Sequence, residues 1–223
     1  MADGDLRIVL DLDDTLYPER DYVRSGFGAV GSYVAEHLGI SNFGQYCWER
    51  FLAGERGHLF DSALTALGGS ADRDTVDQLV HIYRTHRPRI HLYPDAERLL
   101  KRAALRGTYL GLITDGPATS QRAKIEALHL TRYFRSMLLT DELGLGKAKP
   151  HPASFELIQG ALGPMGGLVY IADNPAKDFL TPNQLGWDTI RVLRPEGLYG
   201  KVTAPSSKHE ARVTVSSLDG VKI

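Results

Sequence analysis

Three aspartates, Asp11, Asp13 and Asp14, stand at the end of the first apolar run of the chain. Aspartate is a poor strand former and a buried carboxylate is costly, so this placement calls for a functional explanation. Asp11 and Asp13 are two residues apart, and on an extended strand end such side chains point to the same side. Because two adjacent carboxylates repel each other, either one pKa rises or a cation joins them.

Three other apolar runs are also followed by polar residues that suit chemistry on a charged oxygen group. These residues are Thr114 and Asp115, then Lys149, then Asp173 and Asp178. In parallel α/β sheets, ligands bind beyond the carboxyl ends of the strands, so we expect these groups to share one edge. Carboxylate oxygens favour a hard cation, and a site that leaves room for water and phosphate favours Mg²⁺. A lysine and a threonine hydroxyl would hold phosphate oxygens.

The elements that must position these residues alternate along the chain. Near-continuous apolar runs, typical of strands buried on both faces, cover 6–12, 108–114, 135–140, 166–172, 187–193 and 211–215. Helical segments with proline near the start or glycine near the end cover 94–107, 117–130, 152–163 and 175–186. Pro182 is expected to end or kink the last of them. The alternation predicts an α/β fold with a parallel sheet covered on both sides.

Residues 17–91 break this alternation. They contain no convincing apolar strand, but several stretches carry apolar residues at helical spacing. We therefore predict an all-helical lobe at 17–91, inserted into a core formed by 1–16 and 92–223. The glycines between residues 25 and 31 do not follow a strand, so they are interpreted as helix-packing residues rather than a dinucleotide loop. Arg24, Arg50 and Arg56 could meet the polar part of a substrate but are interpreted mainly as surface residues.

Composition narrows the class of protein. The 223 residues include 26 Lys and Arg against 27 Asp and Glu, which gives no electrostatic case for a nucleic-acid or anionic-membrane partner. The single cysteine, Cys47, allows no intrachain disulfide, and the eight histidines show no zinc-ligand spacing. The first residues lack the features of a signal peptide, and no run is long enough to span a bilayer. These features lead us to expect a cytoplasmic protein.

Taken in order, the four polar segments resemble the four motifs of the haloacid dehalogenase (HAD) superfamily of phosphohydrolases. The matching segments are Asp11-Leu12-Asp13-Asp14-Thr15, Thr114 in LITDG, Lys149 in KAKPHPASF, and Asp173 with Asp178 in YIADNPAKDF. The resemblance implies a Rossmann-like three-layer core. It also implies that the helical insertion is a cap of the C1 type, with residues 16–18 in the segment that lets it move.

The resemblance also implies a role for each residue. Asp11 would be the nucleophile that forms an aspartyl-phosphate, and Asp13 would protonate the leaving oxygen and then activate water. Thr114, Asp115 and Lys149 would bind phosphoryl oxygens. Mg²⁺ would be held by the carboxylates of Asp11, Asp173 and Asp178 and by the backbone carbonyl of Asp13. Asp178 would alternatively orient Lys149.

Some positions depart from the family pattern or have a second interpretation. Asp14 stands where the family often has glycine, and it is interpreted as a turn or supporting residue. Lys147 is a rival for the role of Lys149 but is not next to proline. Asp115 could alternatively cap the helix that follows it. Ala172 replaces a frequent glycine, which is a small change.

The sequence therefore predicts a Mg²⁺-dependent phosphatase acting on a small phosphorylated metabolite such as a sugar phosphate or a nucleoside monophosphate. A phosphomutase of the same family is the nearest alternative. A dehalogenase is disfavoured because such enzymes lack the second aspartate, here Asp13. A phosphate-accepting signalling module or an inactive binding protein is the alternative from another class.

Overall fold

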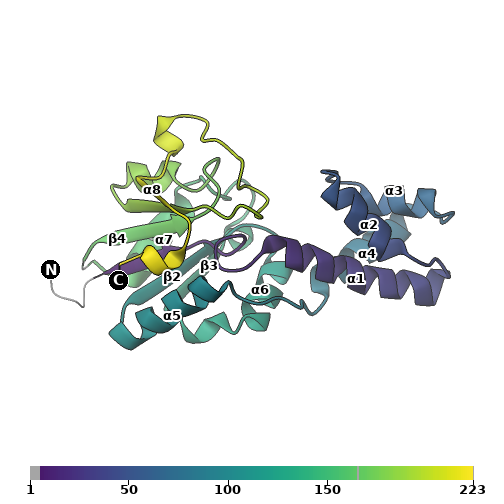
Figure 1. Ribbon diagram of the computed structural model, residues 1–223, viewed down its shortest axis with the longest axis horizontal. Coiled ribbons are helices and arrows are strands. Elements are labelled where there is room, and N and C mark those ends of the chain that lie inside the picture. The colour runs from purple at the N-terminus through teal and green to yellow at the C-terminus, as the bar shows by residue number, and fades with distance from the viewer. Residues whose placement is uncertain (1–5, 165, 223) are drawn as a thin grey trace. The chain divides into compact units, whose positions relative to one another are not determined.

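A computed structural model describes residues 6–164 and 166–222 (Figure 1). Residues 1–5, 165 and 223 belong to the predicted core range but lie outside the described residues. The chain divides into two compact units, one formed by 1–19 with 91–223 and the other by 20–90. Each unit is described by itself below.

The first unit contains a sheet of six strands in the order β3-β2-β1-β4-β5-β6, and every neighbouring pair is parallel. The strands are β1 (Arg7–Leu10), β2 (Tyr109–Thr114), β3 (Ser136–Leu139), β4 (Leu168–Ala172), β5 (Asp188–Val192) and β6 (Val213–Val215). The parallel α/β sheet expected from the sequence is confirmed. The chain order reverses between β1 and β4, so the carboxyl ends of β1, β2 and β4 lie next to one another, where ligands bind in such folds.

The helices of this unit are α5 (Pro94–Arg106), α6 (Ala118–Ala127), α7 (Ala153–Leu162) and α8 (Leu180–Gln184). The predicted helix at 175–186 is wrong in its extent, because the described helix has only five residues. Residues 174–178 form a turn in which Asn174 N–H donates to Asp178 Oδ2 at 3.1 Å. Pro182 neither ends nor kinks the helix. It is the third helical residue, where a backbone N–H would have no intrahelical acceptor.

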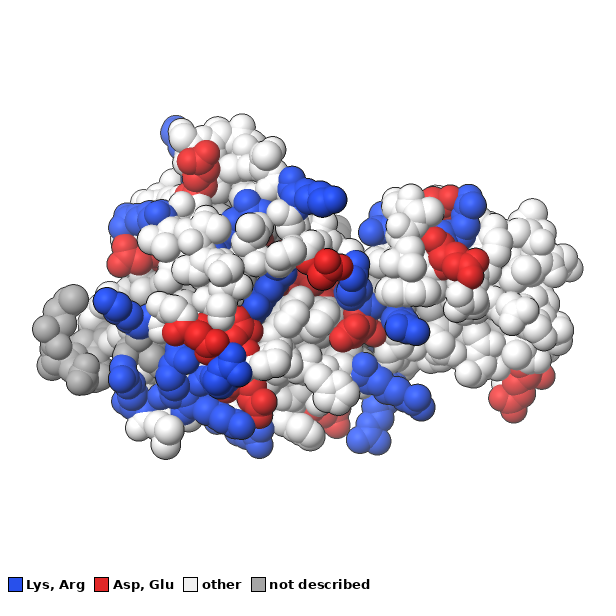
Figure 2. All heavy atoms as spheres, in the orientation of Figure 1, with Lys and Arg blue, Asp and Glu red and all other residues white. Residues whose placement is uncertain are grey.

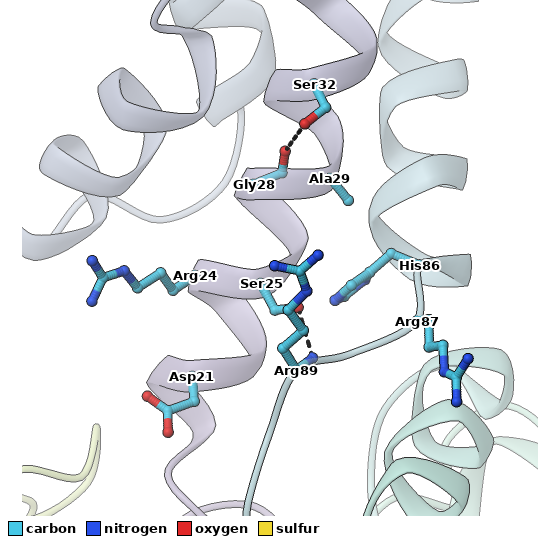
Figure 3. Close-up of a pocket in the computed structure, with 9 residues that line it drawn as sticks. All are labelled: Asp21, Arg24, Ser25, Gly28, Ala29, Ser32, His86, Arg87 and Arg89. Atoms are coloured by element: carbon cyan, nitrogen blue, oxygen red, sulfur yellow. Dashed lines mark hydrogen bonds between the residues drawn. The ribbon is translucent and has the colours of Figure 1, made fainter.

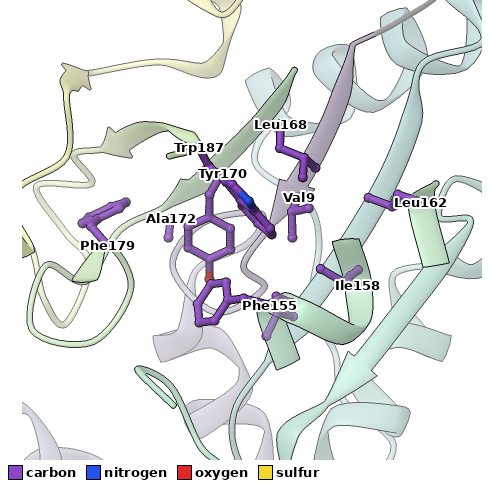
Figure 4. Close-up of a cluster of buried hydrophobic side chains, with 10 residues drawn as sticks. Val9, Phe155, Ile158, Leu162, Leu168, Tyr170, Ala172, Phe179 and Trp187 are labelled. Atoms are coloured by element: carbon purple, nitrogen blue, oxygen red, sulfur yellow. The ribbon is translucent and has the colours of Figure 1, made fainter. Parts of the chain in front are cut away.

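A cluster of apolar side chains packs between the sheet and α7 (Figure 4). Phe155 of α7 makes edge-on contacts with Tyr170 at 5.3 Å and Trp187 at 5.9 Å between ring centroids. Val9, Tyr170 and Phe155 have no solvent exposure. The ring of Tyr170 thus lies in the core, while its hydroxyl group serves the polar site described below.

The second unit contains α1 (Glu19–Leu38), whose first residue still belongs to the first unit, α2 (Phe43–Leu52), α3 (Leu59–Ala66) and α4 (Arg73–Thr85). Phe27 of α1 contacts the rings of Phe51, Phe60 and Tyr83 at centroid distances of 6.2, 6.1 and 5.7 Å. A Cβ atom on Gly44 would lie 2.4 Å from the carbonyl oxygen of Phe27, so α1 and α2 require glycine where they meet.

Charged side chains of both signs are scattered over the face shown in Figure 2, and basic ones gather over α5. Several of these are paired. Lys101 Nζ lies 2.7 Å from Glu97 Oε1, and Arg98 Nη2 lies 2.6 Å from Asp219 Oδ2. The second pair ties the C-terminal segment to α5. Among the described residues, no helix is both long and apolar enough to cross a bilayer.

Candidate active site

The ends of three adjacent strands bring the predicted residues together. β1 ends at Leu10, two residues earlier than predicted, and Asp11 N–H donates to the Ile171 carbonyl of β4 at 3.0 Å. Thr114 is the last residue of β2, and Asp173 follows the last residue of β4. Asp13 therefore lies beyond the end of β1, in an isolated bridge with Tyr17, so the alternation of side chains along β1 does not set its direction.

Lys149 lies at the centre of this edge. Its ammonium nitrogen is 2.5 Å from Asp11 Oδ1, 2.8 Å from Asp178 Oδ1 and 3.2 Å from the Tyr170 hydroxyl. The side chain has no solvent exposure. Burial alone would lower the pKa of Lys149, but Asp11 and Asp178 raise it well above its ordinary value, so the group is a fixed cation. Lys147, its rival in the sequence, instead lies 3.2 Å from His151 Nε2.

Asp11, Asp173 and Asp178 form a compact group of buried carboxylates. One oxygen from each lies within 4.8 Å of the others. Burial, followed by Asp11 and Asp178, raises the pKa of Asp173 well above its ordinary value. Burial also raises the pKa of Asp11 to about 6 in spite of Lys149. Asp173 Oδ2 is buried and has no hydrogen-bond partner. A buried oxygen of this kind, beside two further carboxylates, fits a hard divalent cation such as Mg²⁺.

The Asp13 carboxylate faces a different set of side chains. Lys124 Nζ donates to its Oδ1 at 2.7 Å, Gln121 Nε2 donates to its Oδ2 at 2.8 Å, and the Tyr17 hydroxyl donates to Oδ1. Burial opposes ionisation, but Lys124 and the hydrogen bonds outweigh it and lower the pKa of Asp13. Gln121 Nε2 also donates to Thr114 Oγ1, so α6 joins the two predicted catalytic side chains.

Asp14 occupies the turn after β1. Its φ of 52° lies in the left-handed region, which explains why glycine suits this position. Its buried carboxylate accepts hydrogen bonds from the backbone N–H groups of Glu19 at 2.9 Å and Leu198 at 2.6 Å. Asp14 therefore anchors the turn to the segment after β5.

Asp115 does not cap the helix that follows it, which corrects the alternative interpretation of this residue. At the start of that helix, α6, the Ala118 backbone N–H instead donates to Asp141 Oδ2 at 2.9 Å. The Asp115 carboxylate accepts from Lys177 Nζ at 2.9 Å, from the Lys149 backbone N–H at 3.1 Å and from a threonine hydroxyl. Burial opposes this ionisation, yet Lys149 and Lys177 lower the pKa of Asp115 to about 2. An ionised carboxylate would repel a phosphoryl oxygen. In the structure the Asp115 side chain instead holds the loop that carries Lys149, through the Lys149 backbone N–H.

Comparison with known families agrees with this arrangement. A family model described as haloacid dehalogenase-like hydrolase matches residues 7–186. The chain belongs to this hydrolase family. The match includes all four polar segments.

Two curated relatives of the hydrolase are phosphatases. It is 28% identical to a glyceraldehyde 3-phosphate phosphatase of Methanocaldococcus jannaschii, over 95% of this chain and 92% of that protein. It is 33% identical to a phosphoserine phosphatase of Thermus thermophilus over 144 residues, which are 63% of this chain and 57% of that protein.

Solved structures share the fold of the hydrolase at lower identity. A 2-haloacid dehalogenase from Pseudomonas syringae is 24% identical, with a TM-score of 0.63 over 97% of this chain and 95% of that one. A HAD phosphatase from Thermococcus onnurineus is 21% identical, with a TM-score of 0.60 over 95% and 94%. Since both chemistries occur on this fold, the reaction must be argued from the site.

Sequence reasoning missed several residues of the site in the hydrolase. These are Gln121, Lys124, Tyr170 and Lys177. Tyr17 is a further one, because the sequence predicts it only as part of the mobile segment 16–18. One signal was available: Gln121 and Lys124 are three residues apart on α6, and both are buried although polar. Polar residues on the buried face of a helix that follows a functional strand end indicate a site rather than a core.

The helical unit of the hydrolase has a cavity of its own, of about 500 Å³, lined by α1 and the segment after α4 (Figure 3). Arg24 and Arg89 line it, and the Arg89 backbone N–H donates to Ser25 Oγ at 2.9 Å. Arg50 and Arg56, the other arginines singled out in the sequence, do not line it. Arg50 pairs with a neighbouring glutamate, and the Arg56 guanidinium stacks 3.8 Å from the centroid of a phenylalanine ring.

Proposed function

We propose that the hydrolase is a Mg²⁺-dependent phosphatase that cleaves a small phosphorylated metabolite through an aspartyl-phosphate on Asp11. The observation that carries this proposal is the buried contact between Asp11 and Lys149, beside the carboxylates of Asp173 and Asp178. A carboxylate nucleophile next to a fixed cation suits attack on a negatively charged phosphoryl group.

The chemistry follows in two steps. An Asp11 oxygen forms a bond to phosphorus and the bond from phosphorus to the ester oxygen breaks. Asp13, which must first take up a proton from solvent although Lys124 favours its ionised form, gives that proton to the departing oxygen. A water molecule then attacks the aspartyl-phosphate, Asp13 takes a proton from that water, and Asp11 is released with inorganic phosphate. Lys149 and Thr114 hold phosphoryl oxygens in both steps.

The Mg²⁺ ion would be held by Asp11, Asp173, Asp178 and the backbone carbonyl of Asp13. When bound, it would offset negative charge on the phosphoryl group. Asp178 is also engaged with Lys149 and the Tyr170 hydroxyl, so it supports the lysine whether or not it contacts the metal directly. The unpartnered Asp173 Oδ2 supports a role as a metal ligand.

Small metabolites are the proposed substrates, with sugar phosphates and nucleoside monophosphates as the first classes to test. The relative that this chain matches over 92% of its length is named as a glyceraldehyde 3-phosphate phosphatase. Glyceraldehyde 3-phosphate is a three-carbon sugar phosphate, which supports this choice. Residues 20–90 would act as the cap that closes over the substrate and excludes water. The protein is proposed to act in the cytoplasm, and its partners would be these substrates.

The test is phosphate release from a panel of phosphorylated metabolites, with Mg²⁺ or with EDTA. We expect the wild-type protein to release phosphate from some of these metabolites when Mg²⁺ is present and from none in EDTA. The Asp11→Asn variant should release no phosphate under either condition. Asp188→Asn is the matched control, because Asp188 is exposed at the opposite ends of the strands. Full activity in Asp11→Asn would refute the mechanism.

Two alternatives give different results in the same experiment. Isomerised sugar phosphate without free phosphate would identify a phosphomutase. A lasting phosphoprotein that forms from a small phosphodonor, with no turnover, would identify a phosphate-accepting module instead of an enzyme.

A further inference from the structure

We propose that Lys124, Gln121 and Tyr17 are positioning residues that aim the Asp13 carboxyl group at the oxygen of the leaving group. This inference rests on the proposed phosphatase function. It concerns side chains that contact Asp13 rather than the phosphoryl group itself.

Both oxygens of Asp13 are engaged by side chains. Lys124 Nζ and the Tyr17 hydroxyl donate to Oδ1, and Gln121 Nε2 donates to Oδ2. A carboxylate held at only one oxygen can turn about its side-chain bonds, but donors on both oxygens fix its plane. The donors come from two directions, since Tyr17 follows β1 closely in the chain and the other two belong to α6.

The donors are themselves well fixed. The side chain of Lys124 is only 5% exposed, and its ammonium nitrogen lies 6.0 Å from the centroid of the Tyr17 ring, which is fully buried. A buried ammonium group in this position carries a cost that surface lysines avoid, so it needs the Asp13 carboxylate as a partner. The arrangement keeps a cation beside Asp13 without placing that cation in open solvent.

Gln121 connects Asp13 to Thr114. Its Nε2 donates both to Asp13 and to Thr114 Oγ1, and Thr114 is the residue proposed to hold a phosphoryl oxygen. α6 begins four residues after Thr114, so this linkage is set by a short, continuous segment. The group that handles the leaving oxygen and the group that holds the phosphoryl oxygen therefore share one fixed support.

A structural role for Lys124 and a positioning role predict different kinetics. Asp13 donates its proton during cleavage of the ester, and an aryl ester with a good leaving group needs this proton far less than an alkyl ester. General acid catalysis contributes roughly 10²- to 10⁴-fold. Misplacing the acid would therefore penalise alkyl phosphates selectively, whereas a looser fold would lower kcat/KM for all esters alike.

The experiment compares kcat/KM for a series from nitrophenyl phosphates to alkyl phosphates, because this ratio reports the step in which the leaving group departs. We expect Lys124→Met to lower kcat/KM for alkyl phosphates at least about tenfold more than for nitrophenyl phosphates, within the range of acid catalysis. Lys124→Arg should restore most of the difference, and Asp13→Asn should set the limiting dependence on the leaving group.

Tyr17→Phe removes one hydroxyl group and should shift the dependence in the same direction by a smaller amount. It provides the test if Lys124→Met does not fold, as judged by thermal unfolding. Arg122→Met is the matched control, because Arg122 also lies on α6 but pairs with Glu142 on an exposed surface. This control should leave the whole series unchanged.

Equal losses across the series in both Lys124→Met and Tyr17→Phe would overturn the inference and assign these residues a structural role. Wild-type rates in both variants would overturn it as well. Failure of the proposed function is a separate result, since the wild-type protein itself would then release no phosphate from any ester with Mg²⁺ present.

Discussion

Replacing the proposed nucleophile should make the metal-free protein more stable. Burial raises the pKa of Asp11 from its ordinary value of 3.8 to about 6. The folded protein therefore binds this proton more tightly than the unfolded chain, and stability falls as the pH rises from about 4 to about 6. Each pKa unit corresponds to about 1.4 kcal/mol, so above pH 6 the ionised carboxylate costs about 3 kcal/mol.

Asp11→Asn removes this charge and keeps the size of the side chain, while Lys149 retains Asp178 as a partner at 2.8 Å. We expect the variant to be more stable than the wild-type protein by up to about 3 kcal/mol at about pH 8 in EDTA. For a chain of this size, this gain corresponds to a rise in Tm of about 6–10 °C.

The assay is thermal and urea unfolding of both proteins in EDTA, at several values between about pH 4 and pH 8. The stabilisation should shrink as the pH falls, because the wild-type carboxyl then becomes protonated. Saturating Mg²⁺ should stabilise the wild-type protein more than the variant, because Asp11 is a proposed ligand. An Asp11→Asn protein that is less stable than the wild type in EDTA at about pH 8, or a gain that does not change with pH, would refute this reasoning.

Further predictions concern the other charges of the first unit. Lys149→Met should lower stability by about 3–5 kcal/mol in EDTA and reduce activity by more than about 10²-fold, whereas Lys147→Met should do neither, as unfolding and phosphate release will reveal. The apparent Mg²⁺ affinity, measured by calorimetry, should weaken by roughly tenfold or more for each pH unit below about 6, because protons compete for Asp11; constant affinity would contradict this. Arg194→Met breaks a buried pair with Asp95 at 2.8 Å and should cost about 3–5 kcal/mol in urea unfolding, which a loss below about 1 kcal/mol would contradict.

The sheet and its functional edge were predictable because the central strands β1, β2 and β4 are largely buried on both faces. Such strands appear in the sequence as continuous apolar runs, and their carboxyl ends are marked by the polar residues that follow. The position of Lys149 was also predictable, since the two lysines of its loop differ in their proximity to proline. The structure separates them by burial, with Lys149 inside the carboxylate cluster and Lys147 beside His151.

The side chains around Asp13 were not predictable from the apolar runs of the sequence alone. Which face of α6 is turned toward Asp13 depends on how the helix packs after the turn at Gly116, and the sequence does not specify that rotation. The contacts of the Asp115 carboxylate were not predictable for a related reason. Its partners Thr140 and Lys177 are distant in sequence, and only the folded sheet brings them to one carboxylate.

The pairing of charges at this edge explains why the site points to a cation. Lys149 forms ion pairs with Asp11 and Asp178, Lys124 pairs with Asp13, and Lys177 pairs with Asp115.

Asp173 differs from these carboxylates, because the described part of the chain brings no lysine or arginine side chain into an ion pair with it and its buried Oδ2 accepts no hydrogen bond. Its pKa is raised well above the ordinary value, first by burial and then by Asp11 and Asp178, so its surroundings oppose the charged form. A divalent ion beside this carboxylate would supply the missing positive charge. Adding a lysine would instead neutralise Asp173 permanently. Among the described residues of this edge, Asp173 is therefore a carboxylate that an exchangeable cation, rather than a side chain of the protein, is suited to neutralise.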